Sequence, residues 1–295
     1  MKVSHPKHIY PPVNRCIYCD SAEGKLSSEH IVPFGLLGRH ELPEASCRDC
    51  AEKTGRIENI VLKDYMGGFR SRMQFPNRRG RKRNYPLKCY EFIGSDNSFR
   101  AVEISPDEYP KTLFLPKLSR PGMFLTPEQN RRIASAPLEW WIHHDDHGAK
   151  ILREKLGFIP LFVIEPDVSA LAHMIGKVCH SYACAVIGYE RLREYKMYYP
   201  PALLDMPREH IYFIVGGSTP IRQNNTSYEI NIIESVMGNL QLVIATVRFL
   251  AWLGAPAYRT IVASRPAPPN APRSPIQRGS LSTPAPEDRN PFPSR

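Results

Sequence analysis

The sequence predicts an α+β protein with a small N-terminal unit, a larger second unit and a tail. Two Cys-x-x-Cys pairs bracket strand and helix patterns near the N-terminus. Apolar runs separated by turn signals dominate the second half, as is typical of a mainly antiparallel sheet. The last 30 residues contain nine prolines, so we expect a disordered tail. The expected parts are a cysteine-bounded unit at 13–66, a basic arm at 67–86, an α+β domain at 87–264 and the tail at 265–295.

In the first unit, the pattern predicts a strand, a turn, a second strand and a helix. Residues 25–32 have a strand pattern that ends at Pro33, which cannot donate to a ladder. Two glycines indicate the turn, and residues 42–46 form the returning strand. From 48 to 65 apolar residues recur every three or four positions, which favours a helix.

The second unit mixes helices with strands. Residues 87–93 and 99–104 flank a Gly-Ser-Asp-Asn turn and predict a hairpin, whereas residues 105–137 look irregular. Residues 166–188 carry apolar side chains at helical spacing, and a shorter helix follows at 189–197. Four further apolar runs predict strands of one sheet: 211–215, 228–233, 240–250 and 258–263.

The charge balance favours a polyanionic partner. The net charge is +10, and residues 66–90 hold eight basic and no acidic residues. We expect this arm to contact nucleic-acid phosphates, DNA in preference to RNA, with weak sequence preference; the alternative is a solvated charged loop. The expected contacts are Arg70, Arg72, Arg78, Arg79, Arg81, Lys82 and Arg83.

The N-terminus lacks the apolar segment of a signal peptide, and no apolar run approaches the roughly 20 residues that span a bilayer. We therefore expect a cytoplasmic protein with no membrane partner. Paired cysteines in a reducing compartment favour metal binding over disulfides. Cys16, Cys19, Cys47 and Cys50 supply the four thiolates of a tetrahedral structural zinc, and unmetallated thiols are the other alternative.

Between the two cysteine pairs lies Glu29-His30, which suits phosphodiester hydrolysis. That reaction needs a base for water, a cation for the developing charge and a grip on the phosphates. His30 is the expected base, and Glu29 the expected ligand of a catalytic Mg²⁺ or Mn²⁺. Neighbours in a strand point to opposite faces, so both serve one site only if the strand ends there.

These residues resemble the HNH endonuclease family, whose fold is the ββα-metal finger. The resemblance implies structural zinc on the four cysteines, metal-dependent cleavage of nucleic acid, His30 as the residue that activates water and Glu29 as an acidic metal ligand. Residues 244–258 are also similar to a stretch of uncharacterised bacterial proteins that carry this finger. The matching motifs are Cys16-x-x-Cys19, Leu26-Ser-Ser-Glu29-His30-Ile-Val-Pro33, Gly35 with Gly38, and Ala45-Ser46-Cys47-x-x-Cys50.

One position departs from the family pattern. Many HNH fingers place Asn or His just after the last cysteine pair as a further metal ligand, whereas this chain has Ala51. Hard cations prefer several oxygen ligands, so another residue is needed. We expect Glu58, two helical turns along the same face, with Glu52 and Asn59 as alternatives. The alternatives for Glu58 are a surface carboxylate or a salt bridge to Lys53 or Arg56, and a metal-free, inactive finger also stays open.

Other candidate sites are weaker. His143 and His147 would share a helix face, but a polar turn explains them better than a metal. Cys179-His180 lies inside an apolar helix, and His40 lies in the finger loop. The sequence thus predicts a metal-dependent HNH endonuclease, possible as a homodimer for double-strand cuts. The alternative is a non-catalytic zinc-finger protein that binds nucleic acid.

Overall fold

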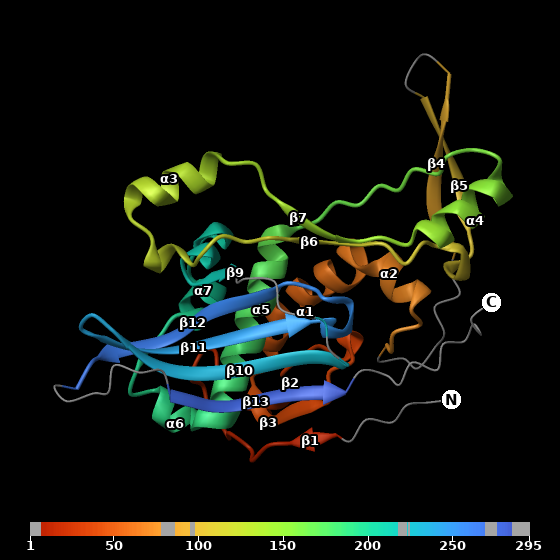
Figure 1. Ribbon diagram of the computed structural model, residues 1–295. Coiled ribbons are helices and arrows are strands. Elements are labelled where there is room, and N and C mark those ends of the chain that lie inside the picture. The colour runs from red at the N-terminus through yellow and green to blue at the C-terminus, as the bar shows by residue number, and fades with distance from the viewer. Residues whose placement is uncertain are drawn as a thin grey trace.

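The computed structural model is a mixed α+β fold with antiparallel sheets, as the sequence predicts (Figure 1). The predicted nucleic-acid contacts Arg78, Arg79, Arg81, Lys82 and Arg83 lie outside the described residues. The structure describes residues 7–77, 86–94, 98–217, 223, 225–268 and 276–284.

The N-terminal part forms a three-stranded sheet followed by a helix, in the expected order. Strand β2 pairs antiparallel with β3, and the short β1 pairs parallel with β3 on its other side. A 3-10 turn over Phe34–Leu36 joins β2 to β3. Gly38 is required there, because a Cβ would lie 1.9 Å from the carbonyl oxygen of Val32. The elements are β1 (His8–Ile9), β2 (Ser27–His30), β3 (His40–Ser46) and α1 (Arg48–Asn59), which continues as a π-helical segment at Ile60–Tyr65.

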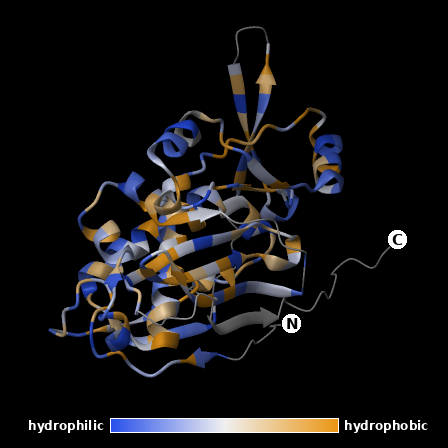
Figure 2. Ribbon diagram, turned by 60° about the vertical axis from the view of Figure 1, so that its left-hand side comes forward, coloured by the Kyte–Doolittle hydropathy of each residue, from blue (hydrophilic) through white to orange (hydrophobic). Residues whose placement is uncertain are grey.

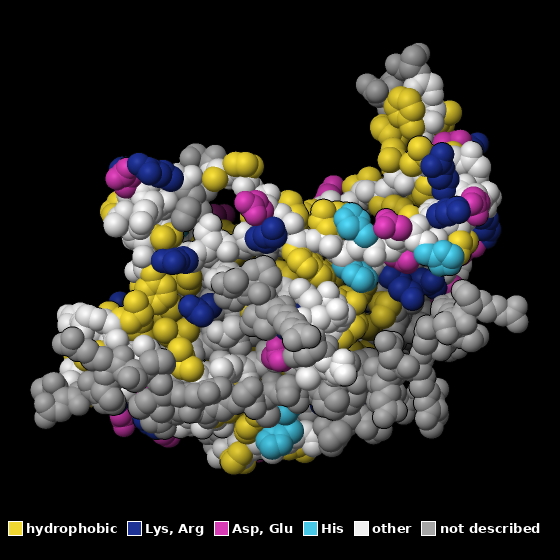
Figure 3. Space-filling model, in the orientation of Figure 1, with side chains coloured by type: hydrophobic (Ala, Val, Ile, Leu, Met, Phe, Trp, Pro, Cys, Tyr) yellow, Lys and Arg dark blue, Asp and Glu magenta, His cyan; other side chains and the backbone are white. Residues whose placement is uncertain are grey.

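The middle of the chain holds two separate strand pairs. The predicted hairpin forms from β4 and β5 and projects from the rest of the molecule (Figure 1). Hydrophobic side chains are exposed along this hairpin (Figure 3), Phe92 and Phe99 among them. The prediction that 105–137 is irregular was wrong, because this region contains β6 and α3. The bounds are α2 (Gly67–Arg72), β4 (Leu87–Ile93), β5 (Ser98–Ile104), β6 (Leu113–Pro116), α3 (Pro127–Ser135), β7 (Trp140–His143) and α4 (Asp146–Leu156), with 3-10 turns at Pro106–Glu108 and Gly122–Phe124.

The central helix α5 (Val168–Ala183) confirms the expected buried helix. It continues through a π-helical segment, Cys184–Gly188, into α6 (Tyr189–Leu192). The whole span, Val168–Leu192, has the length and apolar character to cross a membrane, but 83% of its apolar window is buried inside the protein. The same test is passed by the core helix of a soluble protein, and α5 packs against both α1 and the main sheet.

The main sheet is antiparallel, with strand order β13-β10-β11-β12-β8 and β9 beside β12. Two expectations were wrong. The expected strand at 211–215 is mostly a 3-10 helix, Arg208–Phe213, and the expected helix at 189–197 ends at Leu192 and is followed by strand β8. Within the Pro-rich tail, Ile276–Pro284 form β13, which pairs with β10. The bounds are β8 (Lys196–Met197), α7 (Tyr199–Leu204), β9 (Val215–Gly217), β10 (Thr226–Met237), β11 (Leu240–Phe249), β12 (Ala257–Pro266) and β13 (Ile276–Pro284).

The larger hydrophobic core runs through both predicted units. It includes Ile17 and Leu42 of the N-terminal cysteine-bounded unit at 13–66, which we call the finger, Leu171 and Ile175 of α5, and Val243 of the main sheet. Along β10 buried and half-buried positions alternate, and Figure 2 shows hydrophobic and hydrophilic residues alternating along the strands. The finger therefore shares its core with the rest of the protein, and side chains of α5 contact it directly.

Candidate metal centre and active site

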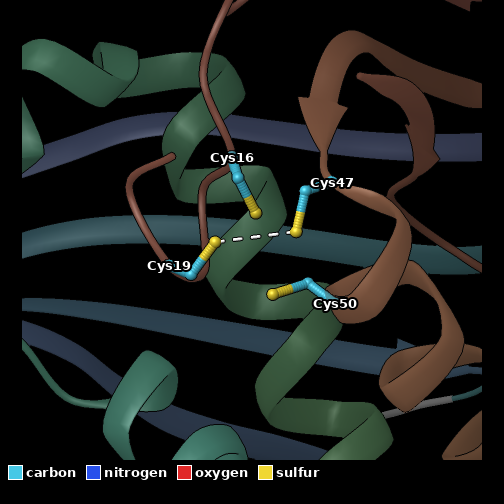
Figure 4. A group of neighbouring side chains, drawn as sticks. All are labelled: Cys16, Cys19, Cys47 and Cys50. Carbon is cyan, nitrogen blue, oxygen red and sulfur yellow. Dashed lines mark hydrogen bonds between the residues drawn. The ribbon is translucent and has the colours of Figure 1, made fainter. Parts of the chain in front are cut away.

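Four cysteines from two parts of the finger converge on one point (Figure 4). Cys16 and Cys19 come from the loop before β2, Cys47 caps α1, and Cys50 lies in the first turn of that helix. Their sulfur atoms all lie within 4.8 Å of one another, and Cys19 Sγ is 3.6 Å from Cys47 Sγ.

This donor set fits a tetrahedral ion. Zn–S bonds of about 2.3 Å in a tetrahedron place the sulfur atoms about 3.8 Å apart. None of the seven cysteines, all of which lie in the described residues, is in a disulfide. Burial raises the pKa of the Cys16 thiol to about 11, so a bound cation is what would favour its thiolate. The cluster is geometrically suited to a metal ion and is consistent with structural zinc.

The two carboxylates expected to hold a catalytic cation do meet, but around a lysine. Lys177 of α5 forms ion pairs with Glu29 of β2 and with Glu58 of α1, whose Oε1 lies 2.9 Å from Lys177 Nζ. The same ammonium donates to the carbonyl oxygen of His30 and lies 3.4 Å from that of Ile31. We call Glu29, Lys177 and Glu58 the Glu–Lys–Glu cluster.

This cluster is almost sealed from solvent. The Lys177 side chain is 1% exposed, that of Glu29 8% and that of Glu58 13%. Burial raises the pKa of Glu29, the charge of Glu58 adds to this, and Lys177 only partly offsets both. Burial alone would lower the pKa of Lys177, but Glu29 and Glu58 outweigh it and raise that pKa. Lys177 is therefore held in its charged form.

The carboxylates of Glu29 and Glu58 consequently do not fit a Mg²⁺ or Mn²⁺ ion in this arrangement. The ammonium of Lys177 occupies the position between them and carries the compensating charge. Glu58 does meet Glu29 at one cation, as expected, but that cation is the ammonium of Lys177. In this arrangement both carboxylates are therefore bound by Lys177.

His30 lies on the other face of β2, as the alternation of a strand requires. It is the last residue of that strand, its side chain is 24% exposed, and its Nδ1 lies 3.6 Å from Oε1 of Glu41 on β3. His30 and Glu41 are direct partners in the β2–β3 ladder. Glu41 Oε2 also lies 2.5 Å from Nζ of Lys7. His30 thus has a carboxylate neighbour in Glu41, but Glu29 is not on the same face of the strand.

Two of the predicted phosphate contacts in the basic arm, Arg70 and Arg72, lie in the described residues. Arg70 is 2% exposed, and its guanidinium donates to the carbonyl oxygens of Gly35, Leu62 and Pro76. Its assignment as a phosphate contact is corrected, since these bonds hold the β2–β3 turn against the helical segment. Arg72 is half-buried at the end of α2.

The weaker candidates form no second metal site. Among the residues that the structure describes, the four cysteines are the one group of three or more His, Cys, Asp or Glu ligands close enough for an ion. His180 is buried with Nε2 2.8 Å from the carbonyl oxygen of Ile17, and burial raises the pKa of the Cys179 thiol to about 12. His40 is buried beside His8 and Tyr228, and it precedes Glu41 in β3, so the two side chains point to opposite faces of that strand.

Sequence reasoning missed two residues of this site. Lys177 is the one lysine or arginine in the apolar helix α5, which is a signal that a partner of opposite charge is buried nearby. Glu41 had no such signal, because only the strand register places it opposite His30.

Comparisons of the chain with protein-family models, curated proteins and solved structures find no match.

Proposed function

We propose that the chain hydrolyses phosphodiester bonds in nucleic acid as an HNH-type endonuclease, with His30 as the general base. The observation that carries the proposal is the pair formed by His30, partly exposed at the end of β2, and Glu41 beside it on β3. The strand–turn–strand–helix order and the cysteine cluster, which we infer to hold zinc, support the same assignment.

The pair has the arrangement that a base and its orienting group need. A carboxylate near Nδ1 favours the imidazole tautomer that keeps its proton there, which leaves Nε2 to accept a proton from water. The separation of 3.6 Å is longer than a hydrogen bond, and such contacts often tighten when substrate binds. Glu41 is held in turn by Lys7. Glu41 is therefore a positioning residue for His30.

The test is nicking of supercoiled plasmid by the zinc-loaded protein, with Mg²⁺, with Mn²⁺ and without added divalent cation. Loss of a general base typically slows a reaction by about 10² to 10⁴-fold, which is the effect expected for His30→Ala. Glu41→Gln should slow cleavage less and alter its pH profile. His210→Ala, at an exposed histidine of the 3-10 helix Arg208–Phe213, is the matched control. Equal cutting by the native protein and His30→Ala would refute the assignment.

The Glu–Lys–Glu cluster favours a second candidate, a non-catalytic zinc-finger protein that binds nucleic acid. A lysine in place of a catalytic cation removes the usual means of stabilising the developing phosphorane charge. The net charge of +10 still suits a phosphate backbone. Salt-sensitive binding of DNA by a preparation that cuts neither DNA nor RNA under any of the three metal conditions would select this candidate.

A further inference from the structure

The environment of Lys177 is a complete cation site made of oxygen atoms. Two carboxylates, from Glu29 and Glu58, and two backbone carbonyls, from His30 and Ile31, surround Nζ. An ammonium has three N–H donors, and here the two carboxylates and the His30 carbonyl accept them. Carboxylate and carbonyl oxygens are also the donor set that hard divalent cations prefer.

We propose that Lys177 is the resident cation of this site, and that its ammonium excludes divalent cations from Glu29 and Glu58. The site takes Mg²⁺ or Mn²⁺ only when the lysine is removed. This proposal goes beyond the proposed function and does not depend on whether the finger cleaves nucleic acid.

The charge balance explains why the two cations exclude each other. With all three side chains ionised, the cluster has one uncompensated negative charge. Adding a divalent ion beside Lys177 would leave one excess positive charge in a buried site, where unpaired charge is costly. Replacing the ammonium by a divalent ion brings the cluster to neutrality. Lys177→Ala also removes the side-chain stem and leaves room for the ion and its water ligands.

The lysine also connects distant parts of the molecule to the candidate base. Lys177 comes from α5, 147 residues beyond His30, and donates to the backbone carbonyl of His30 itself. Glu29 of β2 and Glu58 of α1 are bound by the same atom. Lys177 is therefore a positioning residue that fixes the end of β2.

The experiment compares zinc-loaded native protein with Lys177→Ala and with Lys177→Ala/Glu58→Gln. Lys117→Ala, at an exposed lysine whose pair with Glu139 has a separation of 3.4 Å, is the matched control. Free Mn²⁺ is measured by electron paramagnetic resonance, and thermal melts are recorded against Mg²⁺ concentration. Zinc loading keeps the cysteines filled, and Mg²⁺ avoids thiolate ligands.

Lys177→Ala should bind Mn²⁺ at least ten-fold more tightly than the native protein and the Lys117→Ala control. Its melting temperature should rise with Mg²⁺, and both effects should vanish in the double variant. If Lys177→Ala does not fold alone, Mg²⁺ or propylammonium should restore folding. Native protein that binds Mn²⁺ through Glu58, or a Lys177→Ala variant that neither binds Mn²⁺ nor is restored by these cations, would overturn the proposal. These measurements are independent of nuclease activity.

Discussion

Removal of the Lys177 charge should be among the most damaging single changes in this protein. Lys177→Met keeps most of the side-chain volume but leaves Glu29 and Glu58 without their counter-ion. All three side chains are at most 13% exposed, so water replaces little of the lost interaction. Breaking a buried ion pair by removing one partner costs about 3–5 kcal/mol.

The triple variant Lys177→Met/Glu29→Gln/Glu58→Gln separates charge from packing. It has no buried charge, and its amide groups can donate to the carbonyl oxygens that the ammonium leaves. We expect it to recover most of the stability lost in Lys177→Met, because removing all members of a buried ionic cluster is often close to neutral.

Urea denaturation of the zinc-loaded proteins measures both differences as changes in the free energy of unfolding. The control Lys117→Met, at an exposed ion pair, should stay within about 0.5 kcal/mol of the native protein. If Lys177→Met also stays within about 1 kcal/mol, or if the triple variant is no more stable than Lys177→Met, the buried-charge reasoning fails.

Three further predictions concern other parts of the structure. Cys47→Ala should lower the zinc content from about one ion per chain to near zero and unfold the finger, because metal binding and folding of such sites are coupled. Elemental analysis measures the zinc and circular dichroism the folding, and a stable metal-free finger would contradict the prediction. Arg70→Met should lower the free energy of unfolding by about 2–4 kcal/mol, since three carbonyl oxygens lose their donor. It should leave the DNA affinity of the folded protein unchanged in a gel-shift assay, whereas a lower affinity would show that Arg70 contacts phosphate. Burial lowers the pKa of His180 to about 4, so below pH 6.5 the unfolded chain binds a proton that the native state does not bind. The free energy of unfolding should therefore fall by about 3 kcal/mol between pH 6.5 and 4. In urea denaturation at several pH values, His180→Gln should reduce this fall.

Local pattern was sufficient to predict the order of strands and helix in the N-terminal part of the chain. The proline and glycine positions around the turn, the cysteine spacing and the helical periodicity all act over a few residues, and β2, β3 and α1 formed where expected. The buried helix expected at 166–188 was likewise evident from apolar spacing, and the structure has it as α5 and the π-helical segment that follows. Such signals work because each depends on residues that are neighbours in the chain.

Which residues meet at the site depends on tertiary contacts, and these cannot be predicted from a local sequence pattern. Lys177 reaches His30 across 147 residues of chain, and its role is set by how α5 packs on the finger. Strand β13 forms in a proline-rich segment because β10 presents an edge to pair with. Arg70 seemed a surface cation by composition, yet Gly35 leaves space for its guanidinium inside the fold.

The central claim is that a lysine ammonium, and not a divalent metal, lies between Glu29 and Glu58. A crystal structure of the zinc-loaded protein grown with Mn²⁺ tests this directly through anomalous scattering. We predict one anomalous peak at Cys16, Cys19, Cys47 and Cys50, with Lys177 Nζ in contact with both carboxylates. A manganese peak between Glu29 and Glu58, with Lys177 displaced, would contradict the account.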